Sequence, residues 1–342
     1  MGSVPSFARA RASRTARRVR ITAVMCALLV ALYVASLMFG QTFYTPGDVL
    51  GVILGDFVPG ASFTVGELRL PRATMGLLAG AAFGLAGITF QTMLRNPLAS
   101  PDIVGISSGA SAAAVVAIVL LSLSDAFVSA LALGAGMMTA LLIYVLAYKD
   151  GVVGTRLILI GIGISAMLES IVAYVIVRAA SWDLQVAMRW LTGSLNGASW
   201  NEILPLAVAF AVLAPLLLSQ SRNLALMQQG DDSALALGVR VERTRLLVIL
   251  AAVGLISFAT AAAGPIAFVA FMSGPIAARV LRDGRSLMMP SALVGALLVL
   301  AADMLGQYAF GTRYPVGVIT GALGAPYLVY LLIRTNRAGS SL

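Results

Sequence analysis

The side chains that could do chemistry are scarce in this chain, and what is missing excludes several classes of function. The 342 residues include no histidine, one cysteine (Cys26) and one lysine (Lys149). Histidine is the commonest metal ligand, and a single cysteine can form neither an internal disulfide nor a zinc cluster. The lysine lies in Tyr148-Lys149-Asp150, so the Gly-Lys-Ser/Thr of a phosphate loop is absent. We therefore expect no catalytic residues, no metal site and no ATP bound by this chain.

Two acidic residues, Glu169 and Asp303, lie inside apolar runs of the sequence. A carboxylate at the centre of a bilayer costs about 2.5–3.5 kcal/mol on insertion scales, so each should face protein or water. Such residues can relay protons, which would suit a proton-coupled carrier. Neither has an evident basic partner inside the membrane, however, and two isolated acids make a thin relay. We favour structural hydrogen bonding inside a helix bundle.

The composition predicts the elements that hold these residues. Hydrophobic residues make up 60% of the chain and charged residues 11%, with a mean hydropathy of +0.96, whereas soluble domains are about 25% charged. A spanning helix needs about 20 mainly apolar residues. Runs of that kind occur at 21–40, 73–93, 105–122, 127–147, 157–177, 203–219, 246–263, 289–309 and 316–333. The chain is therefore predicted to be an all-α polytopic membrane protein.

A tenth, shorter apolar piece lies between Gly264-Pro265 and Gly274-Pro275. Ile266–Ser273 would rise only about 12 Å as a helix, so we expect a half-helix buried against other helices. Counting it, the chain has about ten membrane elements, with both termini on one side.

The net charge of +9 could suggest nucleic acid, but the cations sit in short connectors between the spans. With the N-terminus in the cytoplasm, only five of the 23 Lys and Arg residues fall outside: Arg69, Arg72, Arg178, Arg189 and Arg313. That split obeys the positive-inside rule. We predict a basic cytoplasmic arm (1–20), one transmembrane domain (21–335) and a cytoplasmic tail (336–342).

Glycines recur at four-residue spacing in one predicted span, at Gly76, Gly80 and Gly84. Small residues at this spacing let helix backbones approach closely inside a membrane. Packing within one bundle is a better interpretation than a dimerisation motif.

Several motifs resemble a known family, the FecCD-type permeases. They are Leu68-Arg69-Leu70-Pro71-Arg72, the segment Arg95–Asp102, Gly105–Ala110, Gly230–Ala234 with Leu237-Gly238-Val239, and Pro315–Gly321 with Gly324-Ala325-Pro326. They occur in the family's order over nearly the whole chain past residue 65. FecCD-type permeases are the membrane subunits of ABC importers for iron–siderophores, haem and vitamin B12.

The resemblance implies a BtuC-like fold of ten helices in a bacterial cytoplasmic membrane, in contact with lipid. It also implies partners: a second permease, identical or homologous, two cytoplasmic ABC ATPases that use the ATP, and an extracytoplasmic substrate-binding protein. The rival classes are a proton-coupled carrier and a membrane-embedded enzyme; the second is disfavoured because no nucleophile–base pair is visible.

The resemblance also bears on the cargo. Family members often carry Pro-His-Ile-Ala-Arg after the half-helix, whereas Pro275–Arg279 here reads Pro-Ile-Ala-Ala-Arg and lacks the histidine. Such branches tend to supply one of two different permeases for ferric siderophores. We expect a ferric siderophore, with haem or cobalamin as the alternative.

Arginines at the predicted outer surface are implied docking residues. In the proteins that this chain resembles, outward arginines pair with acids on the binding protein, which here implicates Arg69, Arg72 and Arg313. The alternative is that they reach lipid phosphates. We expect glutamate at both 69 and 72 to weaken docking and to leave folding intact.

The longest polar insertion on the predicted cytoplasmic side is Gln229–Arg245, and the segment of interest within it covers about residues 230–241. The resemblance implies a short coupling helix seated in a groove of an ATPase; a solvated loop is the alternative. The residues implicated are Gly230, Asp231, Asp232, Ala234, Leu237, Gly238 and Val239.

Overall fold

The computed structural model describes residues 4–100, 105–148, 154–282 and 284–339, and no strand occurs among them. Eight helices are long and apolar enough to span a membrane, and two shorter apolar helices join them. Together they make ten membrane elements, the number predicted from the sequence, but the run predicted as a span at 105–122 forms only the shorter helix Ile106–Val119. The helices are α1 (Val4–Met38), α2 (Pro46–Leu54), η1 (Ser62–Arg69), α3 (Leu70–Met93), α4 (Ile106–Val119), α5 (Asp125–Ala147), α6 (Gly154–Val177), α7 (Ser181–Thr192), α8 (Trp200–Ser219), α9 (Ser221–Met227), α10 (Asp231–Ala236), α11 (Val241–Ala263), α12 (Val269–Leu281), α13 (Met288–Tyr308) and α14 (Val316–Gly339).

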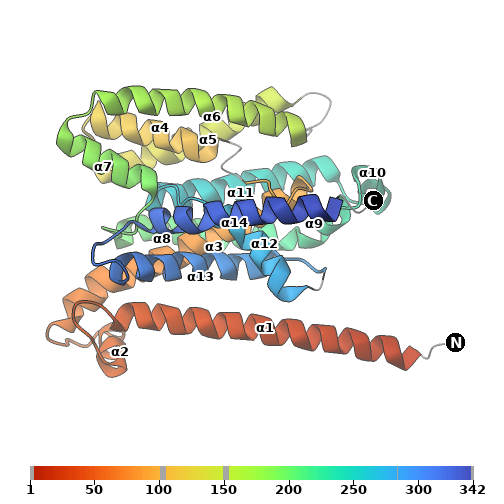
Figure 1. The fold of residues 1–342 in the computed structure, drawn as a ribbon, viewed down its shortest axis with the longest axis horizontal. Helices are drawn as coiled ribbons and strands as arrows, with labels where there is room; N and C mark the ends of the chain where they lie inside the picture. Colours follow the sequence, from red (N-terminus) through yellow and green to blue (C-terminus); the bar gives the residue numbers. More distant parts are fainter. Residues whose placement is uncertain (1–3, 101–104, 149–153, 283, 340–342) are drawn as a thin grey trace.

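The helices run roughly parallel in three layers (Figure 1). Helices α4 to α7 form one outer layer, α1 lies alone on the opposite side, and the other long helices lie between them. Helix α1 begins and α14 ends at the end of the bundle that also holds α10, as an even number of crossings requires. We call this the α10 end; α2 and α7 lie at the opposite, α7 end.

Helix α3 is the centre of the core, since it packs against α8, α11, α12 and α13 and nearly every side chain from Ala79 to Gln91 is buried. The chain is already helical from Ser62, because the π-helical η1 runs directly into α3. The predicted start at residue 73 is therefore too late. Polar residues Glu67, Arg69 and Arg72 lower the local hydropathy and hide the first turns.

The predicted half-helix exists, but its limits differ from those predicted. Helix α12 starts at Val269 and continues through Gly274 and Pro275 to Leu281. A proline inside a helix removes the hydrogen bond to the carbonyl four residues earlier, here Phe271. The amide of Gln91 on α3 donates to that carbonyl instead, at 2.9 Å. This substitute bond explains why the proline does not end the helix.

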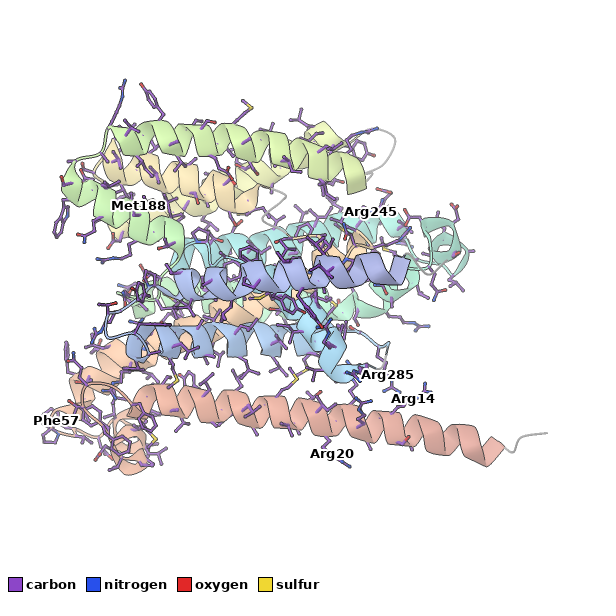
Figure 2. The ribbon with its side chains drawn as sticks, in the orientation of Figure 1. Arg14, Arg20, Phe57, Met188, Arg245 and Arg285 are labelled. Carbon is purple, nitrogen blue, oxygen red and sulfur yellow. The ribbon has the colours of Figure 1, made fainter. Side chains whose placement is uncertain are left out.

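The basic arm is a helical continuation of the first span. Helix α1 is 35 residues long, and its arginine-rich part, which includes Arg14 and Arg20, lies toward the α10 end of the bundle (Figure 2). It is tied to the connector between α12 and α13, because Arg18 donates to the Ser286 carbonyl and Arg285 donates to the Thr15 hydroxyl at 3.1 Å. The sequence did not predict this contact.

Helix α2, at the α7 end, is too short for a span and was not predicted. Thr45 caps it: its backbone N–H and its hydroxyl both donate to Asp48, at 2.9 and 2.7 Å. These bonds lower the pKa of the Asp48 carboxyl below its usual value. The cap is therefore intact above the usual carboxyl pKa and weakens only as the pH falls through the lowered value.

Candidate functional site

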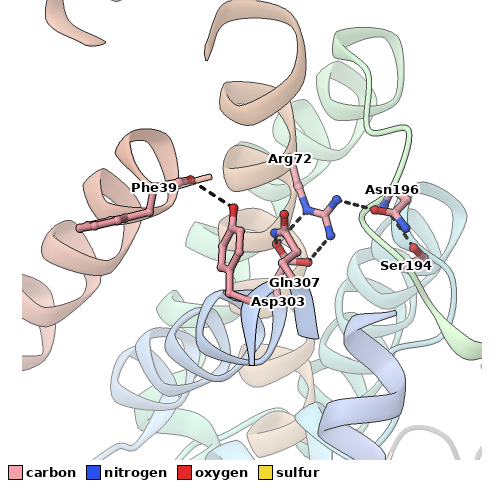
Figure 3. A network of polar contacts seen from close by, with 7 residues as sticks. Phe39, Arg72, Ser194, Asn196, Asp303 and Gln307 are labelled. Carbon is pink, nitrogen blue, oxygen red and sulfur yellow. Dashed lines mark hydrogen bonds and ion pairs between the residues drawn. The ribbon is translucent and has the colours of Figure 1, made fainter. Parts of the chain in front are cut away.

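At the α7 end a polar network joins three parts of the chain that are distant in sequence (Figure 3). Arg72 on α3 makes a bidentate ion pair with Asp303 on α13, with Nε–Oδ2 at 2.9 Å and Nη2–Oδ1 at 2.7 Å. Arg72 also donates to Asn196 in the connector between α7 and α8. Gln307, one turn after Asp303, donates to the same carboxylate at 2.7 Å. The network therefore joins helices α3 and α13 to the connector between α7 and α8.

Asp303 thus has the basic partner that the sequence did not reveal. Its side chain is 6% exposed and that of Arg72 is 18% exposed. A buried charge is strongly destabilising when its partner is removed. The ion pair with Arg72 fits structural bonding inside the bundle, and that role of Asp303 stays a prediction.

Arg69 also makes internal bonds. Its guanidinium donates to the carbonyls of Leu37 and Met38, each at 2.9 Å, and to that of Thr42 at 2.6 Å. It also lies over the ring of Tyr44, 5.0 Å from the centroid. The last carbonyls of a helix have no partner within the helix, so Arg69 caps α1. Glutamate at 69 and 72 would break these internal contacts, contrary to the expectation from the sequence that folding would be unaffected.

Arg313 is the exposed member of the predicted docking set, and it forms no ion pair within the described part of the chain. Arg178 and Arg189 are exposed at the same end of the bundle. The docking role of Arg69, Arg72 and Arg313 stays a prediction.

At the α10 end a second charge cluster fixes the predicted coupling segment. Asp231, the first residue of α10, forms ion pairs with Arg95, which follows α3, and with Arg245 on α11 at 2.7 Å. Arg245 also pairs with Glu242 at 2.8 Å, and Arg95 Nε donates to the Met227 carbonyl at 2.9 Å. The segment is thereby joined to two central helices, α3 and α11, which is what a mechanical link would need.

Helix α10 spans only six residues of the predicted 230–241. Ala234 is fully buried against Met227 and Val239, and Gly230 and Gly238 adopt φ of +118° and +85° at its two ends. Leu235 and Leu237 point away from this small core and are 56% and 61% exposed. The segment therefore contains a short anchored helix whose outer surface carries two exposed leucines beside the exposed Asp232 and Ser233.

A cavity of about 610 Å³ lies between the α4–α7 layer and the middle layer. Its walls come from the start of α4, from α6 and α7, from the connector before α12, and from Leu328 on α14. Glu169 on α6 lines it together with serines of α4 and the aromatic residues Phe268 and Phe271. Among the described residues, no group of three His, Cys, Asp or Glu could hold a metal ion.

Comparison with known proteins identifies the family to which this chain belongs. The FecCD transport family profile matches residues 28–334. The chain belongs to the FecCD transport family. Two curated relatives are the ferric enterobactin permease FepG of Escherichia coli (strain K12), 41% identical over 94% of this chain and 98% of its own, and the iron(3+)-hydroxamate permease FhuG of Bacillus subtilis (strain 168), 35% identical over 95% and 99%.

A solved structure agrees in fold. An inward-facing metal-chelate type ABC transporter superposes with a TM-score of 0.82, at 27% identity over 92% of this chain and 99% of that one. This FecCD chain is therefore a multi-pass membrane protein of a permease family, and such permease subunits are not themselves enzymes. Its relatives are permease components of importers.

Sequence reasoning missed the partners of Asp231 and part of the Arg72–Asp303 network. Arg95 and Arg245 bind Asp231, and Asn196 and Gln307 complete the Arg72–Asp303 network. The signal for Gln307 was available, because it lies four residues after Asp303 on one helix and such pairs meet. No comparable signal exists for Asn196.

Proposed function

We propose that this chain is the permease subunit of an ABC importer and forms part of the passage for a ferric siderophore. The observation that carries the proposal is the 41% identity with a ferric enterobactin permease over 94% of the chain. A second permease, two ATPases on the α10 side and a substrate-binding protein on the α7 side would complete it. In this arrangement the α10 end, with both termini, lies in the cytoplasm.

Reconstitution tests this function against a proton-coupled carrier. Liposomes that contain the chain, its sibling permease and the ATPases, supplied with the binding protein and a ⁵⁵Fe-labelled siderophore, should accumulate iron only with ATP. A proton uncoupler should leave the uptake unchanged. Uptake by the purified chain alone, without nucleotide, would contradict the proposal.

Two observations support the coupling role of residues 230–241. Asp231 forms ion pairs with Arg95 and Arg245, and two leucines of the segment are exposed. An exposed apolar pair on a cytoplasmic segment fits a groove of a partner better than it fits water. We infer that Leu235 and Leu237 insert into the ATPase, while Ala234 and Val239 hold α10 on the permease. Closure of the ATPases would then move α10 and, through Asp231, helices α3 and α11.

Leu237→Glu tests this role. Because the side chain is 61% exposed, the substitution should leave the free energy of unfolding within about 0.5 kcal/mol of the native value. It should lower ATP-driven uptake at least about tenfold, since a truncated or charged anchor in an interface costs about 2 kcal/mol or more. Leu237→Met is the matched control and should keep most of the uptake. Full coupling in the glutamate variant would show that α10 does not dock there.

Arg313→Glu tests docking of the binding protein. Rim charges mainly raise the association rate and lose their effect at high salt. We expect the association rate, measured by surface plasmon resonance on nanodiscs, to fall about tenfold at low ionic strength and little at 0.5 M salt. Arg313→Lys should keep the native rate. An unchanged rate for the glutamate variant at low salt would remove Arg313 from the docking surface.

A further inference from the structure

A polar pocket of about 320 Å³ lies where α8 and α9 meet the start of α11. Five of its lining residues have side chains that donate hydrogen bonds, and none of the described residues in the lining is acidic. The five are Gln220, Asn223, Arg240, Arg243 and Thr244. Two of them carry a full positive charge, so the pocket offers donors and cations to whatever occupies it.

The two arginines of the pocket are not neutralised by the chain itself. Arg240 and Arg243 form no ion pair within the described residues. The acid between them in the sequence, Glu242, pairs with Arg245 at 2.8 Å instead. Arginine presents a planar fork of donors that matches the oxygens of a phosphate. The charge of the pocket therefore favours an anion of that kind.

Thr244 is a buried donor without a partner in the described part of the chain. The residue is 6% exposed, and no described residue accepts or donates a hydrogen bond at its hydroxyl. Buried hydroxyl groups are normally hydrogen-bonded. The oxygen is not among those that the described protein encloses completely, and the residue lines this pocket. An occupant of the pocket can therefore supply the missing bond.

The pocket lies at the depth of lipid headgroups. Helix α8 has 20 residues and rises about 30 Å, which is the thickness of the hydrocarbon core, and Gln220 directly follows it. Toward the middle of the membrane the surface becomes apolar. Leu216 lies one turn before Gln220 and is partly buried, while Leu250 lies one turn after the lining residue Leu247 and is 57% exposed.

We propose that this pocket binds the phosphate of an anionic phospholipid. Arg240 and Arg243 pair with the phosphate oxygens, Thr244 donates its hydroxyl hydrogen to one of them, and an acyl chain lies along Leu216 and Leu250. A zwitterionic lipid would bring its own cation next to two unpaired arginines. A free phosphate, or an acidic side chain of an ATPase, shares the charge but cannot use the apolar surface below. The inference goes beyond the proposed function and does not depend on the cargo.

Lipid binding to the purified full chain tests the proposal. Native mass spectrometry in a neutral detergent counts bound lipids and gives the apparent Kd of the first one. We expect phosphatidylglycerol to bind more tightly than phosphatidylcholine of the same chain length. Glycerol phosphate, which is the same headgroup chemistry without acyl chains, should not displace the bound lipid when added at the concentration of the lipid.

For Arg240→Gln/Arg243→Gln we expect the Kd for phosphatidylglycerol to rise about thirtyfold, at roughly fivefold for each arginine near a membrane surface. The matched control is Arg17→Gln/Arg20→Gln, which removes two exposed charges from α1 and should keep the native Kd. Thr244→Val keeps the shape of the side chain and should raise the Kd about tenfold, because a hydrogen bond to a charged group is lost.

An unchanged Kd in the Arg240/Arg243 variant, or an equal loss in the α1 control, would overturn the site. Displacement by glycerol phosphate would assign the pocket to a free phosphate, and release of the lipid on addition of the ATPases would assign it to their interface; either result would overturn the lipid proposal. Gel filtration verifies folding, and Thr244→Val keeps the proposal testable should the double variant fail to fold. None of these outcomes alters the proposed function, which is tested separately by ATP-dependent uptake.

Discussion

Gly84→Leu is expected to abolish accumulation of the folded permease. A Cβ atom at residue 84 would lie 2.2 Å from the carbonyl oxygen of Ser291 and 3.2 Å from the Cα of Gly295 on α13. These are backbone atoms, so no rotamer change can relieve the overlap, and α3 and α13 must separate. Overpacking of a core costs about 1–3 kcal/mol where side chains can adjust, and we expect the upper end or more here. Thermal unfolding in detergent and the monodisperse yield measure the loss.

Gly134→Leu is the matched control. Gly134 lies on α5, and no atom approaches within 4 Å of its Cβ position, so the same substitution adds a side chain to open space. We expect a native melting temperature and yield. Equal stability of the Gly84 variant and the native protein would show that α3 and α13 do not cross as closely as the structure has them.

Much of this packing could be predicted from the sequence. The spacing of Gly76, Gly80 and Gly84 indicated a face for close helix approach, and the structure confirms packing within the bundle, because Cβ atoms at all three positions would meet α13 or its neighbours. Hydropathy also predicted the long spans. Both signals are local. The glycine spacing along one helix and a run of about 20 apolar residues can each be recognised without knowing which helix packs against it.

Features that depend on a distant residue could not be predicted in the same way. The end of α12 was misplaced, because the bond that replaces the one lost at Pro275 comes from Gln91, 180 residues from its acceptor. The short helices α2, α7 and α9 fall below the length at which hydropathy distinguishes a helix from a connector. In the candidate site, Asp231 was implicated, but neither Arg95 nor Arg245, whose contacts arise only when α3 and α11 are placed side by side.

Arg72 and Asp303 show the same limit with the largest consequence for function. They lie 231 residues apart in the sequence; one was taken for a docking residue and the other for an isolated acid. Arg72→Met should destabilise the protein by about 3–5 kcal/mol, because it leaves the Asp303 carboxylate buried and unpaired. Asp303→Leu should cost a similar amount by stranding the guanidinium, although the partial exposure of Arg72 reduces that cost.

The double variant Arg72→Met/Asp303→Leu should regain most of the lost stability, since a buried ion pair is often replaced by apolar residues at little cost. A coupling energy near zero in this cycle, measured by thermal unfolding of all four proteins, would contradict the structural role of the pair. The double variant also separates the two roles of Arg72. If the double variant folds and still binds the substrate-binding protein at the native rate, the Arg72 guanidinium serves only to stabilise the bundle. If it folds but associates more slowly at low salt, and the difference in rate disappears at high salt, Arg72 contributes to docking as well.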